Sequence, residues 1–279
     1  MGQLDVEDGE VATLKNGVKM PMLGFGTFRI PDGEEVEHSV MSALKIGYRS
    51  IDTASYYRNE TGVGKAIADS GLKRDELFIT TKVWVSEQGY EGTLSALDKS
   101  LSRLGTGYVD LYLVHWPRRG LVKDTWKAME KIYMEGKARA IGVSNFLARH
   151  LEELYSSLDV EPAVNQIEFH PQLYQGALLE KCKEFGIQTE AWSPLMQGNF
   201  KDIGLLKTLA AKYGKTEAQI LLRWDIQHEV VTIPKSTHRD RMAENAMIFD
   251  FEIDNGDMEL LDSLDEGRRY GPNPDVMYE

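Results

Sequence analysis

The stretch Phe78–His115 reads FITTKVWVSEQGYEGTLSALDKSLSRLGTGYVDLYLVH and decides the predicted fold. A short apolar run opens this stretch, Phe78–Lys82, and another closes it, Leu111–His115. Between them, Glu91–Leu104 carries leucines at the spacing of one face of an amphipathic helix. A strand, a helix and a second strand in this order predict two parallel strands joined by a helical crossover.

The same alternation extends in both directions along the chain. A second segment with helical spacing is Lys123–Glu135, in which Trp126, Met129, Ile132 and Tyr133 share one face. An open doubly wound sheet would satisfy the order, but eight units without a break in composition favour a closed eight-stranded parallel β/α (TIM) barrel. The eight apolar runs are Met22–Gly26, Tyr48–Asp52, Phe78–Lys82, Leu111–His115, Ala140–Ser144, Val164–Glu168, Gln188–Ser193 and Val230–Pro234.

The remaining segments predict how the chain is organised around this barrel. Val11–Met20 reads as a β-hairpin about Asn16-Gly17, a dipeptide that accepts the positive φ angles of a tight turn, and it is expected to plug one end. We expect a single domain over residues 1–279, with a flexible N-terminus at 1–10 and a short C-terminal loop. Gly24-Phe25-Gly26 lacks the third glycine of the dinucleotide fingerprint, because Arg29 stands there.

Composition narrows the classes of partner. Lysine and arginine number 32 against 44 acidic residues, a net charge of −12, which disfavours nucleic acid and anionic membranes. The acidic start of the chain and the absence of long apolar runs predict neither a signal peptide nor a membrane span. Cys182 is the only cysteine, so no internal disulfide and no metal site are expected, and a cytoplasmic location fits best.

Four side chains that can carry chemistry fall at or just after strand ends, where barrel enzymes hold their active sites. Asp52, Lys82 and His115 end three consecutive runs, and Tyr57 follows Asp52 by five residues. Each alone has an ordinary structural explanation. Together they are coherent, because an ammonium held by Asp52 would lower the pKa of the phenol, and an imidazole could bind a substrate oxygen. They predict a pocket that polarises a carbonyl group and therefore needs a hydride donor.

The second half of the chain offers groups that could hold such a donor. The amides of Asn145 and Gln166 could pair with a nicotinamide carboxamide, and Trp192 could stack on its ring. A cluster suited to a nucleotide phosphate follows the last strand, where barrels commonly bind phosphate. It comprises Lys235, Ser236, Thr237, Arg239, Arg241, Glu244 and Asn245.

Two other functions remain open at this point. Lys82 could act as a Schiff-base nucleophile in an aldolase-like barrel, although an adjacent Asp52 would keep it protonated. The chain could also be a redox-sensing module that binds the cofactor with little turnover, because a fold and a site do not guarantee activity.

These residues resemble the aldo-keto reductase family over nearly the whole chain. The motifs that carry the resemblance occur in order: Met20–Thr27, Asp52–Glu60, Thr81–Trp84, Leu113–Pro117, Gly142–Phe146, Ile233–Ser236 and Arg269–Asp275. The resemblance implies a catalytic tetrad of Asp52, Tyr57, Lys82 and His115, with Tyr57 as the general acid. It also implies NADPH as cofactor, with Lys235 and Arg241 gripping the 2′-phosphate. The implied cofactor contacts are Gly26, Thr27, Asp52, Ser144, Asn145, Gln166, Trp192, Ser193, Leu195, Lys235, Ser236, Thr237, Arg241, Glu244 and Asn245.

Within that family, the chain is most similar to the small microbial and protozoan glyoxal or methylglyoxal reductases, 2,5-diketo-D-gluconate reductases and prostaglandin F synthases. This implies NADPH-dependent reduction of small aldehydes and ketones, such as methylglyoxal, other 2-oxoaldehydes and aromatic aldehydes, by a monomeric enzyme. Phe28, Trp84 and Trp116, together with His115, would line the substrate pocket. Val85 departs from the family pattern, in which asparagine usually follows the tryptophan.

Overall fold

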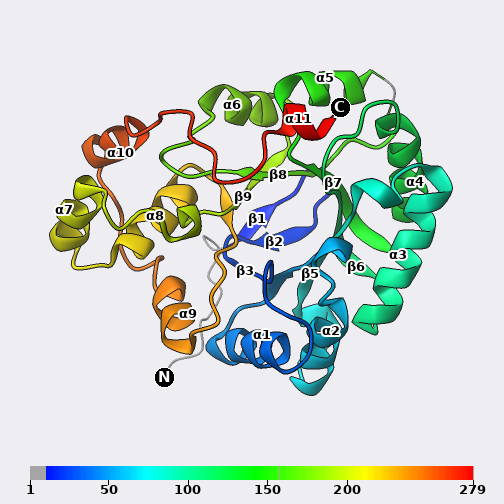
Figure 1. Ribbon diagram of the computed structural model, residues 1–279, viewed down its shortest axis with the longest axis horizontal. Coiled ribbons are helices and arrows are strands. Elements are labelled where there is room, and N and C mark those ends of the chain that lie inside the picture. Colours follow the sequence, from blue (N-terminus) through cyan, green and yellow to red (C-terminus); the bar gives the residue numbers. More distant parts are fainter. Residues whose placement is uncertain (1–10, 157, 279) are drawn as a thin grey trace.

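The computed structural model describes residues 11–156 and 158–278. Residues 1–10, expected to form a flexible N-terminus, lie outside the described part. In Figure 1 the strands occupy the centre and the helices surround them. The sheet has eight strands whose spatial order follows the sequence, so neighbouring strands are parallel and joined by helical crossovers. The strands are β3 (Gly24–Gly26), β4 (Ser50–Asp52), β5 (Phe78–Val83), β6 (Val109–Val114), β7 (Ala138–Ser144), β8 (Val164–Glu168), β9 (Gln188–Trp192) and β10 (Val231–Thr232).

The barrel closes between its first and last strands. Leu23 and Thr232 form a parallel bridge, and the N–H of Thr232 donates to the carbonyl of Met22 at 2.9 Å. Further along the same two segments, the N–H of Gly26 donates to the carbonyl of Pro234 at 3.1 Å. The expected β/α barrel is therefore confirmed, and each of the eight expected strands is present with small shifts at its ends.

The helices pack their apolar faces on the outside of the barrel. In α3 the buried leucines are Leu97, Leu101 and Leu104, as the helical spacing predicts, and Leu94 is only partly buried. The helices are α1 (Glu34–Ile46), α2 (Glu60–Asp69), α3 (Tyr90–Leu104), α4 (Val122–Met134), α5 (Ala148–Tyr155), α6 (Gly176–Glu184), α7 (Gly204–Tyr213), α8 (Glu217–Gln227), α9 (Arg239–Ala246), α10 (Asn255–Asp262) and α11 (Pro274–Tyr278). No helix in the described ranges is long and apolar enough to cross a membrane.

The N-terminal hairpin lies at one end of the barrel, with β1 (Val11–Thr13) antiparallel to β2 (Lys19–Pro21). Met20 and Leu14 are buried in a cluster with apolar side chains of the barrel strands, so the hairpin covers this end as expected. Its turn is tight, because the N–H of Gly17 donates to the carbonyl of Leu14 at 2.8 Å, and the loop contains one residue more than a two-residue turn. The N–H of Leu14 donates to the carbonyl of Val18, and only Gly17 takes a positive φ, of 82°.

The C-terminal segment between α10 and α11 crosses the barrel in Figure 1 near β8 and β9. The N–H groups of Tyr270 and Gly271 donate to Oε1 of Glu168, at 2.6 and 3.1 Å. Gly271 also lies against the indole of Trp192, because a Cβ at this glycine would be 2.2 Å from Cη2 of the ring. A buried carboxylate at the end of β8 thus fixes this segment against a residue of the candidate site.

Candidate active site

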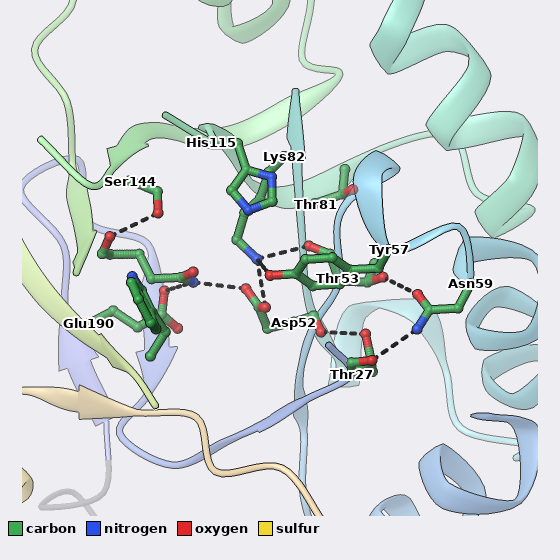
Figure 2. Close-up of polar contacts among 12 residues, drawn as sticks. Thr27, Asp52, Thr53, Tyr57, Asn59, Thr81, Lys82, His115, Ser144 and Glu190 are labelled. Carbon is green, nitrogen blue, oxygen red and sulfur yellow. Dashed lines mark hydrogen bonds and ion pairs between the residues drawn. The ribbon is translucent and has the colours of Figure 1, made fainter. Parts of the chain in front are cut away.

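A fully buried lysine lies at the centre of the candidate site. Nζ of Lys82 on β5 is 2.6 Å from Oδ1 of Asp52, 3.0 Å from the carbonyl of Thr53 and 3.2 Å from the hydroxyl of Tyr57 (Figure 2). The side chain of Lys82 is 0% exposed and that of Asp52 is 3% exposed. The adjacent strands β4 and β5 bring these groups together because both end at the same edge of the sheet.

The loop after β4 fixes the position of Tyr57. This residue ends a short 3₁₀ helix, η2 (Ser55–Tyr57). The hydroxyl of Ser55 lies within hydrogen-bond distance of the carbonyl of Lys82 and of Oε2 of Glu87, at 3.1 and 2.6 Å. Asn59, fully buried, accepts from the hydroxyl of Thr53 at 2.8 Å and donates to backbone carbonyls of the loop after β3. The phenol therefore approaches the lysine from a tightly bonded loop.

Burial dominates the proton affinity of Tyr57. It raises the pKa of the phenol to about 12, although the ammonium of Lys82 acts in the opposite direction. The expectation of a lowered pKa is thus wrong in its net direction, because desolvation of the phenolate exceeds the stabilisation by one ammonium. Burial lowers the pKa of Lys82, but Asp52 and Tyr57 more than offset this, and its pKa is raised. An ammonium that stays protonated is a poor Schiff-base nucleophile, which disfavours the aldolase-like alternative.

His115 lies directly after β6 and is neutral. Burial, with a further contribution from Lys82, holds the pKa of its imidazole well below the usual value. The ring meets the edges of Tyr57 and Trp84, with centroids 5.6 and 5.0 Å away. Nδ1 is buried without a hydrogen-bond partner among the described residues. His115 is therefore a neutral hydrogen-bonding group beside the phenol.

The polar chain continues across the barrel to a residue that the sequence did not indicate. Nε2 of Gln166 on β8 donates to Oδ2 of Asp52 and to Oε2 of Glu190, both at 2.8 Å. None of the described residues donates a hydrogen bond to Oε1 of Gln166. Glu190 on β9 is fully buried, and burial raises its pKa to about 8. A lone acid inside an apolar run carries no motif. Its contact with Gln166 follows from the register of β8 and β9, and its link through Gln166 to Asp52 follows from closure of the barrel.

Further residues expected to hold the nicotinamide gather at the ends of β7 and β9. The hydroxyl of Ser144 donates to the backbone carbonyl of Gln166 at 2.8 Å. Nδ2 of Asn145 donates to the carbonyl of His115 at 2.9 Å, and its Oδ1 accepts from Nε1 of Trp192 at 2.8 Å. Ser193 and Leu195 follow Trp192 in the loop after β9. Gly26 and Thr27 lie across the barrel, at the end of β3 and directly after it.

The expected phosphate cluster lies at the rim, around the loop from β10 into α9. Lys235 and Arg241 are exposed, and neither forms an ion pair with any residue in the described ranges. Ser236 and Asn245 are buried, Thr237 is partly buried, and Glu244 accepts from the hydroxyl of Thr216 at 2.9 Å. In Figure 1, α9 lies outside the barrel beside α1. The structure thus separates this cluster from the tetrad, which is at the barrel centre.

Aromatic rings lie beside the tetrad. Phe28, 43% exposed, lies 4.9 Å from the ring of Tyr57, and Trp116 meets Trp192 at 6.5 Å. Trp84 is stacked on Tyr56, with centroids 3.8 Å apart and an interplanar angle of 17°. Phe28, Trp84 and Trp116 are the expected pocket residues, whereas Tyr56 was not expected. Its adjacency to Tyr57 in the sequence was the only signal.

The fold and the site together define a class: a barrel enzyme with an acid–base group at the carboxyl ends of its strands. Comparison with known proteins gives the family. The model of the aldo/keto reductase family matches residues 22–266, and the chain belongs to this family of NAD(P)H-dependent oxidoreductases.

Individual relatives match over almost their whole length. A glyoxal reductase of Bacillus subtilis (strain 168) is 56% identical, with 96% of this chain and 97% of the relative covered. A 9,11-endoperoxide prostaglandin H2 reductase of Trypanosoma cruzi (strain CL Brener) is 50% identical, with 95% of each covered. Among solved structures, a mutant of Gox0644 in complex with NADPH is 40% identical, with a TM-score of 0.91 and coverage of 95% of this chain and 97% of that one.

Proposed function

We propose that this protein reduces small aldehydes and ketones to alcohols with NADPH, using Tyr57 as the proton donor. The observation that carries the proposal is the buried contact chain from the Tyr57 hydroxyl through Lys82 to Asp52. The substrates we propose are methylglyoxal, other 2-oxoaldehydes and aromatic aldehydes.

Tyr57 keeps its proton at neutral pH until a substrate oxygen accepts it. With a pKa of about 12 the phenol is protonated at neutral pH and is thus available as an acid. When the proton leaves, the adjacent ammonium of Lys82 stabilises the phenolate, and Asp52 holds that ammonium in place. The carbonyl oxygen becomes an alcohol oxygen when it accepts this proton and the carbonyl carbon accepts the hydride that NADPH would supply.

His115 orients the same carbonyl oxygen. Its ring is neutral and lies beside the phenol, so it can form a hydrogen bond without competing as an acid. The oxygen is then held between an imidazole and a phenol, and polarisation of the carbonyl leaves its carbon open to hydride.

The residues present fit NADPH at both of its ends. NADPH supplies the hydride when it is bound. Oε1 of Gln166 lacks a donor among the described residues and can accept from the carboxamide, which Ser144 and Asn145 would also approach. At the rim, Lys235 and Arg241 are cations without ion-pair partners in the described ranges, in a chain of net charge −12. They would pair with the 2′-phosphate, as charge-assisted hydrogen bonds favour.

The aromatic rings beside the tetrad favour small carbonyl substrates over large polar ones. Apolar pockets discriminate weakly between compounds that differ by one or two carbon atoms. Reduction of 2-oxoaldehydes is further supported by the 56% identity to the glyoxal reductase of Bacillus subtilis. We place this activity in a monomeric, cytoplasmic protein that forms one catalytic domain.

Initial rates of NADPH oxidation with methylglyoxal and a panel of aromatic, sugar and keto-acid carbonyls test the proposal. Tyr57→Phe should reduce kcat by at least about 10³-fold, while NADPH still binds with unchanged Kd. Tight NADPH binding without turnover of any carbonyl would favour the redox-sensing alternative.

A further inference from the structure

A buried acid lies behind the proposed nicotinamide site and has no role in the mechanism above. Oε2 of Glu190 shares the Nε2 donor of Gln166 with Asp52. The other oxygen of Glu190, Oε1, is buried and has no hydrogen-bond partner among the described residues. Gln166 therefore connects two carboxyl groups, and its free Oε1 is the atom that would meet the cofactor.

We propose that Glu190 is a proton-linked positioning residue whose ionised form selectively strengthens the binding of NADP⁺. The proposal rests on the proposed function, in which Gln166 contacts the nicotinamide. An ionised Glu190 adds a negative charge to a buried site, joined through Gln166 to the carboxylate of Asp52. The nicotinamide ring carries a positive charge in NADP⁺ and none in NADPH, so only the oxidised cofactor gains from this charge.

The surroundings of Glu190 raise its pKa into the range just above neutral pH. In the sheet, Glu190 lies opposite Gln166 of β8 and Val231 of β10, and neither of these side chains ionises. Burial first, and Asp52 second, raise the pKa of Glu190 to about 8, so it is neutral at pH 7 and ionises just above. The titratable groups that face it from other elements are Asp52 of β4, Lys82 of β5 and Tyr57 of η2.

Binding and proton release are then coupled. When NADP⁺ binds, the carboxylate form is favoured, and the proton of Glu190 leaves to the solvent. When NADPH binds, the proton stays on Glu190. Between about pH 7 and about 9, the Kd for NADP⁺ should therefore fall roughly 3- to 10-fold relative to the Kd for NADPH, the size of one charge–charge interaction in a partly polar interior.

Calorimetric titration at about pH 8 in two buffers with different ionisation enthalpies measures the protons released on binding. The wild type should release a fraction of a proton with NADP⁺ and less with NADPH, and Glu190→Gln should remove the difference. NADPH is an internal control, because both cofactors carry the same 2′-phosphate. Asp225→Asn is the matched control variant, because Asp225 is also a buried acid with a pKa raised by burial, but it bonds Thr232 rather than Gln166.

The outcomes separate the two proposals. Equal proton release with both cofactors, or a difference that survives in Glu190→Gln, overturns the role of Glu190 and leaves the proposed function intact. Failure of the wild type to bind either cofactor overturns the proposed function instead. If Glu190→Gln does not fold, the pH dependence of the two wild-type Kd values decides, and a constant ratio from about pH 7 to about 9 overturns the proposal.

Discussion

Nζ of Lys82 lies 2.6 Å from Oδ1 of Asp52, and both side chains are buried in the middle of the barrel. Removing one member of a buried ion pair leaves an uncompensated charge. Asp52→Asn should therefore lower the free energy of unfolding by about 3–5 kcal/mol, measured by urea unfolding. Asp69→Asn, which removes an exposed partner of Lys65, is the control and should have a much smaller effect. Equal effects of the two substitutions would contradict this account of the buried pair.

The pH dependence of reduction should reflect the high proton affinity of Tyr57. An acid with a raised pKa stays protonated until the pH approaches that value, here about 12. At saturating NADPH, kcat for carbonyl reduction should thus not fall between about pH 6 and about 9. His115 adds no acidic limb in this range, because its pKa is lowered. A loss of kcat with a midpoint below about 9 would contradict the raised pKa of this phenol.

Selection between the two cofactors should depend on the cations after β10. Lys235→Met should raise the Kd for NADPH by about 10-fold or more, and leave the Kd for NADH nearly unchanged, because only NADPH carries the 2′-phosphate. Fluorescence titration with each cofactor measures both constants. Lys207→Met, on α7, removes an exposed cation elsewhere and controls for net charge. A parallel weakening of both cofactors by Lys235→Met would argue against a phosphate contact.

Position 271 should not accommodate a side chain, because Gly271 lies directly against the indole of Trp192. Gly271→Ala forces either the indole or the C-terminal segment to move, at a cost of about 1–3 kcal/mol in the free energy of unfolding. The shift should change tryptophan fluorescence and weaken NADPH binding, because Trp192 bonds Asn145. Gly204→Ala, where a Cβ meets open space, is the control. Unchanged fluorescence and binding in Gly271→Ala would mean that the C-terminal segment moves away from Trp192 without disturbing the cofactor site.

Tyr56 should contribute to substrate choice through Trp84. Its ring covers one face of the indole, and stacked aromatic pairs contribute about 0.5–1.5 kcal/mol. Tyr56→Ala should therefore raise KM for an aromatic aldehyde roughly 3- to 10-fold, and change KM for methylglyoxal less. Tyr90→Ala removes another exposed tyrosine, at the start of α3, and serves as the control. Equal changes for the two substrates would exclude this role.

The barrel could be predicted from the sequence because its signal is repeated. Each buried strand is a short apolar run, and a missed boundary, such as β6 beginning at Val109 and not at Leu111, leaves the order of the elements intact. Contacts that depend on closure could not be predicted. Glu190 meets Gln166 from a neighbouring strand and is joined through it to Asp52 on the opposite side, a relationship that no local pattern contains.

The proton affinity of Tyr57 is a second property that could not be predicted from the sequence. A sequence reveals which charged groups are near in a motif, and thus the influence of Lys82, but it does not reveal how far the fold buries the phenol. Here burial outweighs the ammonium, and the direction of the shift reverses.

The pairing of β3 with the strand at the other end of the sheet also matters while the protein is being made. A growing chain that has not yet reached Thr232 has no partner for the free edge of β3. Unpaired strand edges recruit other chains. Synthesis from the ribosome therefore passes through a long interval in which this edge must be shielded, and a chain interrupted before residue 232 should aggregate rather than persist as a partial barrel.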